Sequence, residues 1–173
     1  SAQPEFEQAK AIFGKAVLQN KAIREFAMPK HVMPPIFSRY ETGMRYGEHI
    51  DNSIMGGIRT DLAMTLFLSP PESYDGGELV IEVDRLPRAI KLPAGSAVIY
   101  SAGSVHRVET VTRGRRQVAV TWIQSMFRDE AKREVIIDLN ATINRLRANS
   151  PDALETLLVT KVRSNLYRMW ADT

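Results

Sequence analysis

Between Ile36 and Gln124 the sequence consists of short β-strand-like runs that are separated by turn residues. Proline and glycine mark the breaks at Ser69-Pro70-Pro71, Asp75-Gly76-Gly77, Pro93-Ala94-Gly95 and Thr112-Arg113-Gly114, because these residues supply the backbone angles that tight turns need. Many short strands at this spacing predict a sandwich or a barrel. A jelly roll of two packed antiparallel sheets is the architecture that we expect. The predicted strands are 36–40, 62–69, 78–83, 88–92, 96–100, 106–111 and 116–124.

Helical periodicity flanks these strands on both sides. Apolar residues recur at helical spacing over residues 5–26, which predicts one covering helix or two. After Arg128 the pattern predicts two more helices, with Ser150 as the N-cap and Pro151 as the first residue of the second. Both helices are expected to pack on the outer sheet of the barrel through their apolar stripes, in preference to forming a dimerisation arm. The stripe of the second helix consists of Leu154, Leu157, Leu158, Val162, Leu166 and Met169.

These patterns predict a mainly β fold with flanking α, a double-stranded β-helix (jelly roll) with an N-terminal helix and a C-terminal helical pair. Residues 1–127 are expected to form the jelly-roll domain with its covering helix, and residues 128–173 a C-terminal helical extension packed on it. With 173 residues the chain is long enough to bury about two-thirds of its unfolded surface. No apolar run approaches the roughly 20 residues that span a bilayer, so we expect no membrane insertion.

The amino-acid composition limits which bonds, metal ligands and partners we expect for this chain. The chain has no cysteine, which excludes disulfides and thiolate ligation of a metal and suits a reducing cytosol, so we expect a cytoplasmic protein. The net charge is +3, and the densest basic cluster comprises Arg107, Arg113, Arg115 and Arg116. Nucleic-acid binding usually needs a broader basic face or a recognisable reading motif, so we do not expect a nucleic-acid partner.

A metal-binding pattern lies within the β-like region, at His49, Asp51 and His106. On a β-strand alternate side chains share a face, so His49 and Asp51 are expected to point the same way, about 6–7 Å apart. His106 lies on another strand-like run and supplies the third ligand. Two imidazoles and one carboxylate leave three adjacent positions of an octahedral metal open, which is the arrangement of non-haem Fe(II) oxygenases. The sequence therefore predicts an iron site.

Arg116 strengthens this interpretation, because it follows His106 inside an apolar run that ends near Trp122. A cation buried beside a metal needs an anion, and a guanidinium matches a carboxylate in bidentate fashion. Arg116 would suit the distal carboxylate of 2-oxoglutarate chelating the metal. Trp122 should share the interior face with Arg116, whereas Arg115 should face the opposite side as a surface charge.

Further motifs follow one another from Pro34 to the C-terminus: Phe37-Ser-Arg-Tyr40-Glu-Thr-Gly43, Tyr46-Gly-Glu-His49-Ile-Asp51-Asn52, Arg59-Thr-Asp-Leu62, Tyr74-Asp-Gly-Gly-Glu-Leu79, Leu92-Pro-Ala-Gly95, Ser104-Val-His106-Arg-Val108, Val111-Thr-Arg-Gly-Arg-Arg116 and Trp122-Ile-Gln-Ser125. In this order they resemble bacterial PKHD-type hydroxylases, which belong to the prolyl-4-hydroxylase-like Fe(II)- and 2-oxoglutarate-dependent dioxygenases. Residues 1–30 match less well, and relatives usually carry an N-terminal lead-in before this region.

The resemblance implies iron ligands His49, Asp51 and His106, a 2-oxoglutarate carboxylate bound by Arg116, and Tyr40 as a hydrogen-bonding partner of the co-substrate. It also implies Fe(II), 2-oxoglutarate and O2 as cofactor and co-substrates, with L-ascorbate keeping the iron reduced. The reaction would couple oxidative decarboxylation of 2-oxoglutarate to succinate and CO2 with hydroxylation of a substrate. The presence of Asp51 favours hydroxylation over halogenation.

Two other functions fit parts of the pattern. A non-catalytic, cupin-like metal-binding or iron-sensing protein would use the same ligands, but it would not need Arg116. A zinc hydrolase or isomerase would use the triad without oxygen or 2-oxoglutarate. The residues do not distinguish an iron-chelating small molecule from a prolyl or lysyl side chain of a protein as the substrate, and they leave open whether the chain forms a homo-oligomer.

Overall fold

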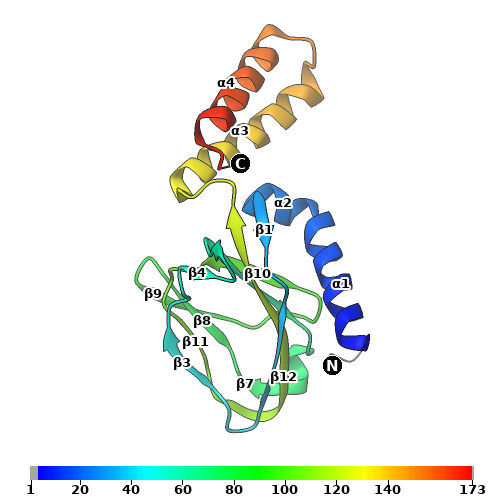
Figure 1. Ribbon diagram of the computed structural model, residues 1–173, viewed down its shortest axis with the longest axis vertical. Helices are drawn as coiled ribbons and strands as arrows, with labels where there is room; N and C mark the ends of the chain where they lie inside the picture. The colour runs from blue at the N-terminus through cyan, green and yellow to red at the C-terminus, as the bar shows by residue number, and fades with distance from the viewer. Residues whose placement is uncertain (1–3, 173) are drawn as a thin grey trace. The chain divides into compact units, whose positions relative to one another are not determined.

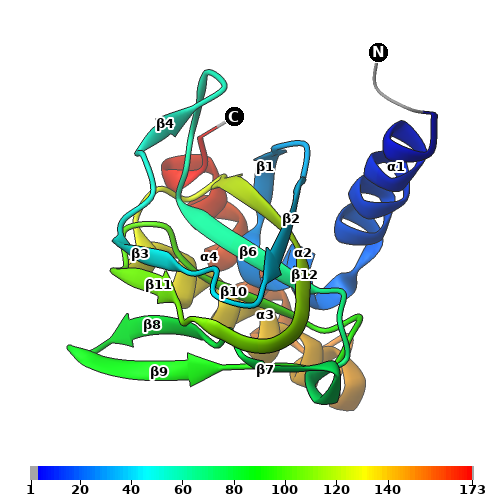
Figure 2. The same ribbon diagram turned by 90° about the horizontal axis from the view of Figure 1, so that it is seen from below.

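The strands form two antiparallel sheets and a short hairpin (Figures 1 and 2). The computed structural model describes residues 4–172. The larger sheet contains β1 (Pro29–Val32), β2 (Ile36–Glu41), β6 (Leu62–Phe67), β7 (Tyr74–Gly76), β10 (Ala97–Ser101) and β12 (Val111–Ser125). Its order is β1-β12-β6-β10, and β2 and β7 also pair with β12. The long strand β12 therefore pairs with four of the other five strands of this sheet, β1, β2, β6 and β7.

The smaller sheet has the order β3-β11-β8-β9. It contains β3 (Tyr46–His49), β8 (Leu79–Val83), β9 (Leu86–Ile90) and β11 (His106–Val108). A hairpin of β4 (Ile54–Met55) and β5 (Ile58–Arg59) lies between β3 and β6 in the chain, and a short 3-10 helix at Pro71–Ser73 precedes β7.

The two sheets share one apolar core. Phe67 and Val118 come from the larger sheet, and Leu79, Ile81 and Val108 come from the smaller one. All five side chains are buried in a single cluster. The core is built by alternate residues of facing strands, as in a sandwich of antiparallel sheets. The predicted mainly β jelly roll with flanking helices is thus confirmed.

Strand β12 is longer than the sequence predicts. The prediction placed a turn at residues 112–114 and began the strand at Arg116, but the strand runs without a break from Val111 to Ser125. Gly114 has a φ of +74°, and a Cβ at this position would lie 2.2 Å from the carbonyl oxygen of Ser73. Glycine is needed here because β7 passes close to β12, with Gly114 paired to Tyr74. The turn prediction at this glycine was wrong for that reason.

The described chain divides into two units, one made of residues 4–16 and 31–124 and the other of residues 17–30 and 125–172. The helices are α1 (Pro4–Gln19), α2 (Lys21–Ala27), α3 (Glu130–Asn149) and α4 (Leu154–Trp170). In the first unit Phe6 of α1 packs edge-on against Phe37 of β2, with ring centroids 5.6 Å apart. In the second unit Phe127 and Ile136 are buried with Met28, and Tyr167 of α4 packs against them. The two predicted C-terminal helices are present.

The start of the last helix differs from the prediction. Ser150 caps the end of α3, where its backbone N–H donates to the carbonyl of Leu146 at 2.7 Å. Helix α4 begins only at Leu154, with Ala153 at the N-cap, and Pro151 lies in the turn between the helices. The hydroxyl of Thr156 donates to the Ser150 carbonyl at 2.7 Å. Ser150 therefore belongs to the connection that closes one helix, and the prediction that it opens the next was wrong.

The apolar stripe of α4 also differs from the prediction that it faces a core. Only Leu166 packs against the buried cluster of the second unit. Helix periodicity identifies residues that share a face, but it does not tell which face of the helix meets a neighbour. The exposed members of the stripe are Leu154, Leu157, Leu158, Val162 and Met169.

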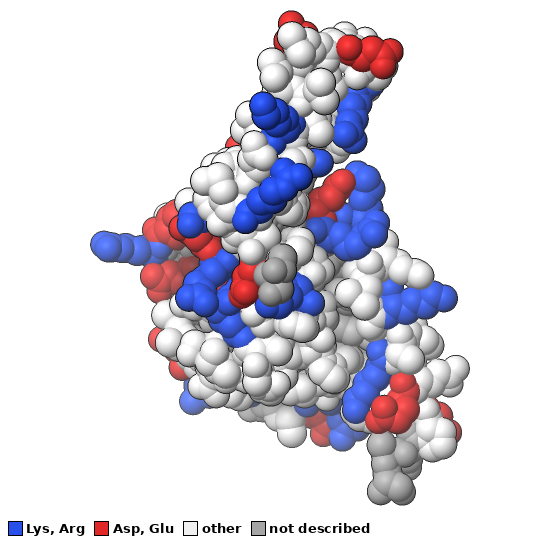
Figure 3. Space-filling model, turned by 45° about the horizontal axis from the view of Figure 1, so that its top comes forward, with Lys and Arg blue, Asp and Glu red and all other residues white. Residues whose placement is uncertain are grey.

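Charges on the visible surface are mixed (Figure 3). Three of the four clustered arginines lie beside carboxylates: Arg113 donates to Asp75 at 2.6 Å, Arg107 to Glu109 at 2.8 Å, and Arg115 lies 3.7 Å from Glu41. The fourth, Arg116, is buried. The predicted basic cluster is thus dispersed among ion pairs. Within residues 4–172, no helix combines the length and the apolar character that crossing a membrane requires.

Candidate metal centre

His49 and His106 lie opposite each other on paired strands. His49 is the last residue of β3, His106 is the first of β11, and the two are direct partners in the antiparallel register. Their ring centroids are 4.1 Å apart. The pairing of two short strands therefore brings together two histidines that are distant in the sequence.

Asp51 joins them from a loop. It lies beyond the end of β3, and its backbone N–H donates to the carbonyl of Ala102 at 3.2 Å. The prediction that His49 and Asp51 share one strand was wrong, because the strand ends at His49 and the chain turns to meet the segment that follows β10. Asp51 Oδ1 nevertheless lies 3.9 Å from His106 Nε2. The predicted ligand atoms of His49, Asp51 and His106 all lie within 4.8 Å of one another.

Both imidazole rings are held in the same manner. His49 Nδ1 lies 2.9 Å from the carbonyl oxygen of Gly47, and His106 Nδ1 lies 2.9 Å from that of Ser104. A carbonyl can only accept, so each Nδ1 carries the proton and each Nε2 keeps a lone pair. Such an outer hydrogen bond fixes the ring of a metal-ligating histidine.

The donor set fits a divalent metal. Two atoms that bind one ion at about 2.1 Å can be no more than about 4.2 Å apart. The Asp51–His106 distance already meets this limit, and small side-chain rotations would bring all three atoms within it. Asp51 Oδ2 is buried and has no hydrogen-bond partner among the described residues. A buried carboxylate oxygen in that state is costly unless a cation lies nearby.

Arg116 lies in the same cavity as the three ligands, which has a volume of about 440 Å³. It is only 1% exposed, and it forms no ion pair with a carboxylate of residues 4–172. Burial lowers the pKa of its guanidinium. The guanidinium carbon lies 5.1 Å from the ring centre of Tyr40, its cross-strand partner, and 5.7 Å from that of Phe67. An unpaired buried cation of this kind needs an anion from outside the chain.

The cavity also contains residues that the sequence interpretation did not single out. Thr65 of β6 is buried, and Tyr100 of β10 packs edge-on against His106 with a centroid distance of 5.2 Å. Burial is the main cause that raises the pKa of Tyr100, and the nearby charge of Asp51 adds to it. Tyr46 packs against His49 in the same way, at 4.4 Å. Alternation along the predicted strands could have placed Thr65 and Tyr100 inward, but only the folded structure shows that Tyr100 contacts His106.

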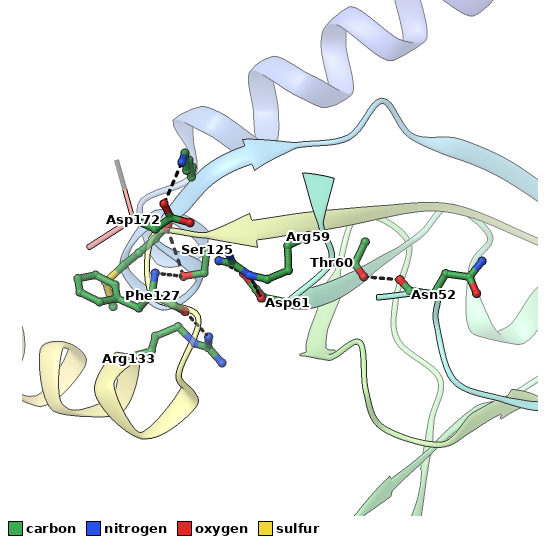
Figure 4. A network of polar contacts seen from close by, with 10 residues as sticks. Asn52, Arg59, Thr60, Asp61, Ser125, Phe127, Arg133 and Asp172 are labelled. Atoms are coloured by element: carbon green, nitrogen blue, oxygen red, sulfur yellow. Dashed lines mark hydrogen bonds and ion pairs between the residues drawn. The ribbon is translucent and has the colours of Figure 1, made fainter. Parts of the chain in front are cut away.

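Arg59 and Asp61 form a two-point ion pair with distances of 2.7 and 2.9 Å (Figure 4). The hydroxyl of Thr60 between them donates to the carbonyl of Asn52. These bonds fix the chain on the C-terminal side of Asp51. Asn52 itself lines the cavity.

Comparisons with known proteins agree with this geometry. Residues 35–124 match the model of the 2OG-Fe(II) oxygenase superfamily. A PKHD-type hydroxylase of Xanthomonas campestris pv. campestris (strain B100) is 42% identical, with 98% of this chain and 78% of that protein covered. Another, from Picosynechococcus sp. (strain PCC 7002), is 46% identical over 91% of this chain and 73% of its own length. The first match includes nearly all residues before Pro34, so the similarity begins earlier than the motifs indicated.

Solved structures show the same fold. A Pseudomonas putida prolyl-4-hydroxylase has a TM-score of 0.53 at 22% identity, covering 72% of this chain and 69% of its own. The viral collagen prolyl hydroxylase of Paramecium bursaria Chlorella virus-1, solved with 2OG, has a TM-score of 0.50 at 18% identity and covers 72% and 76%. From the family model and the hydroxylases that match across most of its length, this chain belongs to the 2OG-Fe(II) oxygenase superfamily, within the PKHD-type hydroxylases.

Proposed function

We propose that this oxidoreductase binds Fe(II) through His49, Asp51 and His106 and hydroxylates a substrate C–H bond with consumption of 2-oxoglutarate and O2. The observation that carries the proposal is the single cavity in which three convergent ligand atoms lie near a buried cation without a carboxylate partner. A protein that only stores or senses a metal has no need of that cation. The metal and co-substrate, when bound, would supply the activation of O2, and the overall reaction converts 2-oxoglutarate, O2 and R–H to succinate, CO2 and R–OH.

The residues of the chain have separate tasks in this reaction. The two histidines and Asp51 would hold the metal, and a set of three protein ligands would leave positions open to ligands from the cavity. The backbone carbonyls that hold the two rings keep that geometry, and the burial of His106 limits the access of water from its side.

Arg116 is proposed to bind the distal carboxylate of 2-oxoglutarate, because a rigid fork of N–H donors suits a carboxylate and the site is shielded from solvent. Tyr40 is its direct neighbour on β2, and burial raises the pKa of the Tyr40 phenol. The phenol therefore stays protonated at neutral pH and is able to donate a hydrogen bond to the co-substrate. L-ascorbate is proposed as a reductant that maintains Fe(II) between turnovers.

The substrate side of the cavity is free of ionised side chains once Asp51 and Arg116 are assigned. Ile36, Tyr46 and Ile50 line it and are each more than half exposed, which makes an apolar mouth. This supports an uncharged group on a small molecule or a peptide as the substrate, and it argues against a nucleic acid, whose phosphates need basic contacts. The cytoplasmic location stays a prediction.

The decisive experiment measures succinate formed from 2-oxoglutarate by the purified protein with Fe(II), ascorbate and oxygen. Arg116→Ala and a zinc-loaded sample serve as comparisons. Succinate that requires both iron and Arg116 would support the dioxygenase half-reaction before any substrate is known. If the iron-loaded protein neither formed succinate nor bound 2-oxoglutarate, a cupin-like metal-binding protein would become the better interpretation.

A further inference from the structure

We propose that Tyr74 is a positioning residue that holds the Nε edge of Arg116, so that the terminal nitrogens of the guanidinium stay directed at the carboxylate-binding end of the cavity. The inference rests on the proposed function, because it concerns how the chain prepares Arg116 for 2-oxoglutarate.

Tyr74 and Arg116 approach each other at Gly77. A Cβ at Gly77 would lie 3.1 Å from Arg116 Cδ and 3.3 Å from Tyr74 Cε2. Both atoms therefore lie close to one point, and each is only one or two bonds from the polar end of its side chain. Gly77 has a φ of +66°, a backbone conformation that favours glycine. Its lack of a side chain also leaves room for Arg116 and Tyr74 to pack closely.

The polar atoms at this contact complement each other. Arg116 Nε and the Tyr74 hydroxyl are both buried, and neither has a hydrogen-bond partner within 3.5 Å among the described residues. One is a donor that lies on the inner edge of the guanidinium, and the other is an oxygen that is able to accept. Two unmatched buried groups on side chains that meet at Gly77 indicate a hydrogen bond that forms when the guanidinium binds its anion.

The positions of the two residues show which of them meets the ligand. Arg116 lines the cavity, whereas Tyr74 does not and is 1% exposed. Tyr74 therefore lies behind Arg116 as seen from the co-substrate. An arginine whose Nε edge is held in this way offers its outer two nitrogens to a carboxylate as a fork.

Tyr74 is itself fixed from its other side. Lys91 Nζ lies 4.0 Å from the ring centre of Tyr74 and donates to the Tyr74 carbonyl at 2.7 Å. Backbone pairing of Tyr74 with Gly114 ties it to the strand that carries Arg116. Lys91 thus holds Tyr74, Tyr74 holds Arg116, and Arg116 binds the carboxylate.

The test compares the binding of 2-oxoglutarate and pyruvate to the Mn(II)-loaded full chain by calorimetry. Pyruvate has the keto acid but lacks the distal carboxylate. Tyr74→Phe removes only the hydroxyl, and we expect it to weaken 2-oxoglutarate about tenfold, which is the usual effect of losing a hydrogen bond to a charged group. Affinity for pyruvate and for Mn(II) should stay within about twofold. Tyr167→Phe, which removes a phenol hydroxyl in the other unit, is the matched control and should change none of these values.

A second pair of variants tests the coupling. Lysine has no Nε–H edge, so in an Arg116→Lys background Tyr74→Phe should cause no further loss of 2-oxoglutarate affinity. Equal losses in both backgrounds would overturn the inference, as would a parallel loss of pyruvate and Mn(II) binding. Unchanged 2-oxoglutarate affinity in Tyr74→Phe, with the wild type still preferring 2-oxoglutarate to pyruvate, would overturn this inference alone. A wild type without that preference would overturn the role of Arg116 and the inference with it.

Discussion

His49 and His106 are partners in the β3–β11 register, and each ring is oriented by the backbone carbonyl that precedes it by two residues. The two histidines are thus positioned by the same local device on two different strands. Because both Nδ1 atoms are engaged, both Nε2 atoms are available on the side of Asp51. This arrangement explains how a metal site is built where only short strands meet.

Asp51→Ala should abolish succinate formation, because it removes one of three proposed ligands. We also expect the affinity for Mn(II), used in place of Fe(II), to fall by at least about tenfold, because even the loss of an outer partner of a metal ligand commonly costs that much. Calorimetry with Mn(II) and a succinate assay would measure both. Asp138→Ala, at an exposed position of α3, is the control. Full turnover in the Asp51 variant would remove this residue from the site.

Arg116→Ala should raise the 2-oxoglutarate concentration needed for half-maximal succinate formation by at least about thirtyfold, which is the cost of truncating one member of a buried charge pair. The adjacent Arg115 is exposed and lies beside Glu41, so Arg115→Ala controls for the loss of one positive charge. Initial rates over a range of 2-oxoglutarate give the comparison. An equal effect of the two variants would show that another cation anchors the co-substrate.

Gly77→Ala should weaken 2-oxoglutarate binding as well as the fold. The added methyl would press on Arg116 Cδ and Tyr74 Cε2, and the positive φ adds backbone strain. Gly95→Ala separates the two effects, since Gly95 also has a positive φ of +86° but no neighbour within 4 Å of its Cβ position. Urea unfolding should show a loss of about 1 kcal/mol for Gly95→Ala and more for Gly77→Ala. Only the Gly77 variant should lose affinity for 2-oxoglutarate.

Stability should fall as the pH rises above about 10, the ordinary pKa of tyrosine. Burial raises the pKa values of Tyr40, Tyr74 and Tyr100 in the folded chain, so these phenols stay protonated while those of the unfolded chain lose protons. The unfolded state then binds fewer protons, and the free energy of unfolding decreases with pH. Urea unfolding at pH 8, 9.5 and 10.5 measures the slope, which Tyr100→Phe should reduce. A constant free energy over this range would contradict the prediction.

The sequence singled out residues that the structure brings together, but it did not predict where each of them lies in the fold. His49, Asp51, His106 and Arg116 were found because their residue types and the strand alternation suggest specific chemistry, and the structure brings all four to one cavity. The loop position of Asp51 depends on its hydrogen bond to Ala102, a contact distant in sequence that no local pattern encodes.

Other errors have the same physical origin. Gly114 signals a turn in the sequence because glycine allows positive φ, yet it lies within β12 where another strand leaves no room for a side chain. Alternation could have placed Thr65 and Tyr100 inward, but the packing of strands around the cavity was needed to bring them to the site. The exposed stripe of α4 shows that periodicity defines a face without identifying its neighbour.

The division of the ligands between a strand pair and a loop has a consequence for the integrity of the fold. An ion bound by Asp51 and His106 would join chain segments that are separated by many residues in the sequence. Such a cross-link closes a long loop, and the longer the loop, the more it restricts the unfolded chain. In a protein without cysteine, the metal would thus act as a removable cross-link at the edge of the sandwich. Chelation would then increase cleavage by proteases in the segment between β3 and β6 before the rest of the sheet opens.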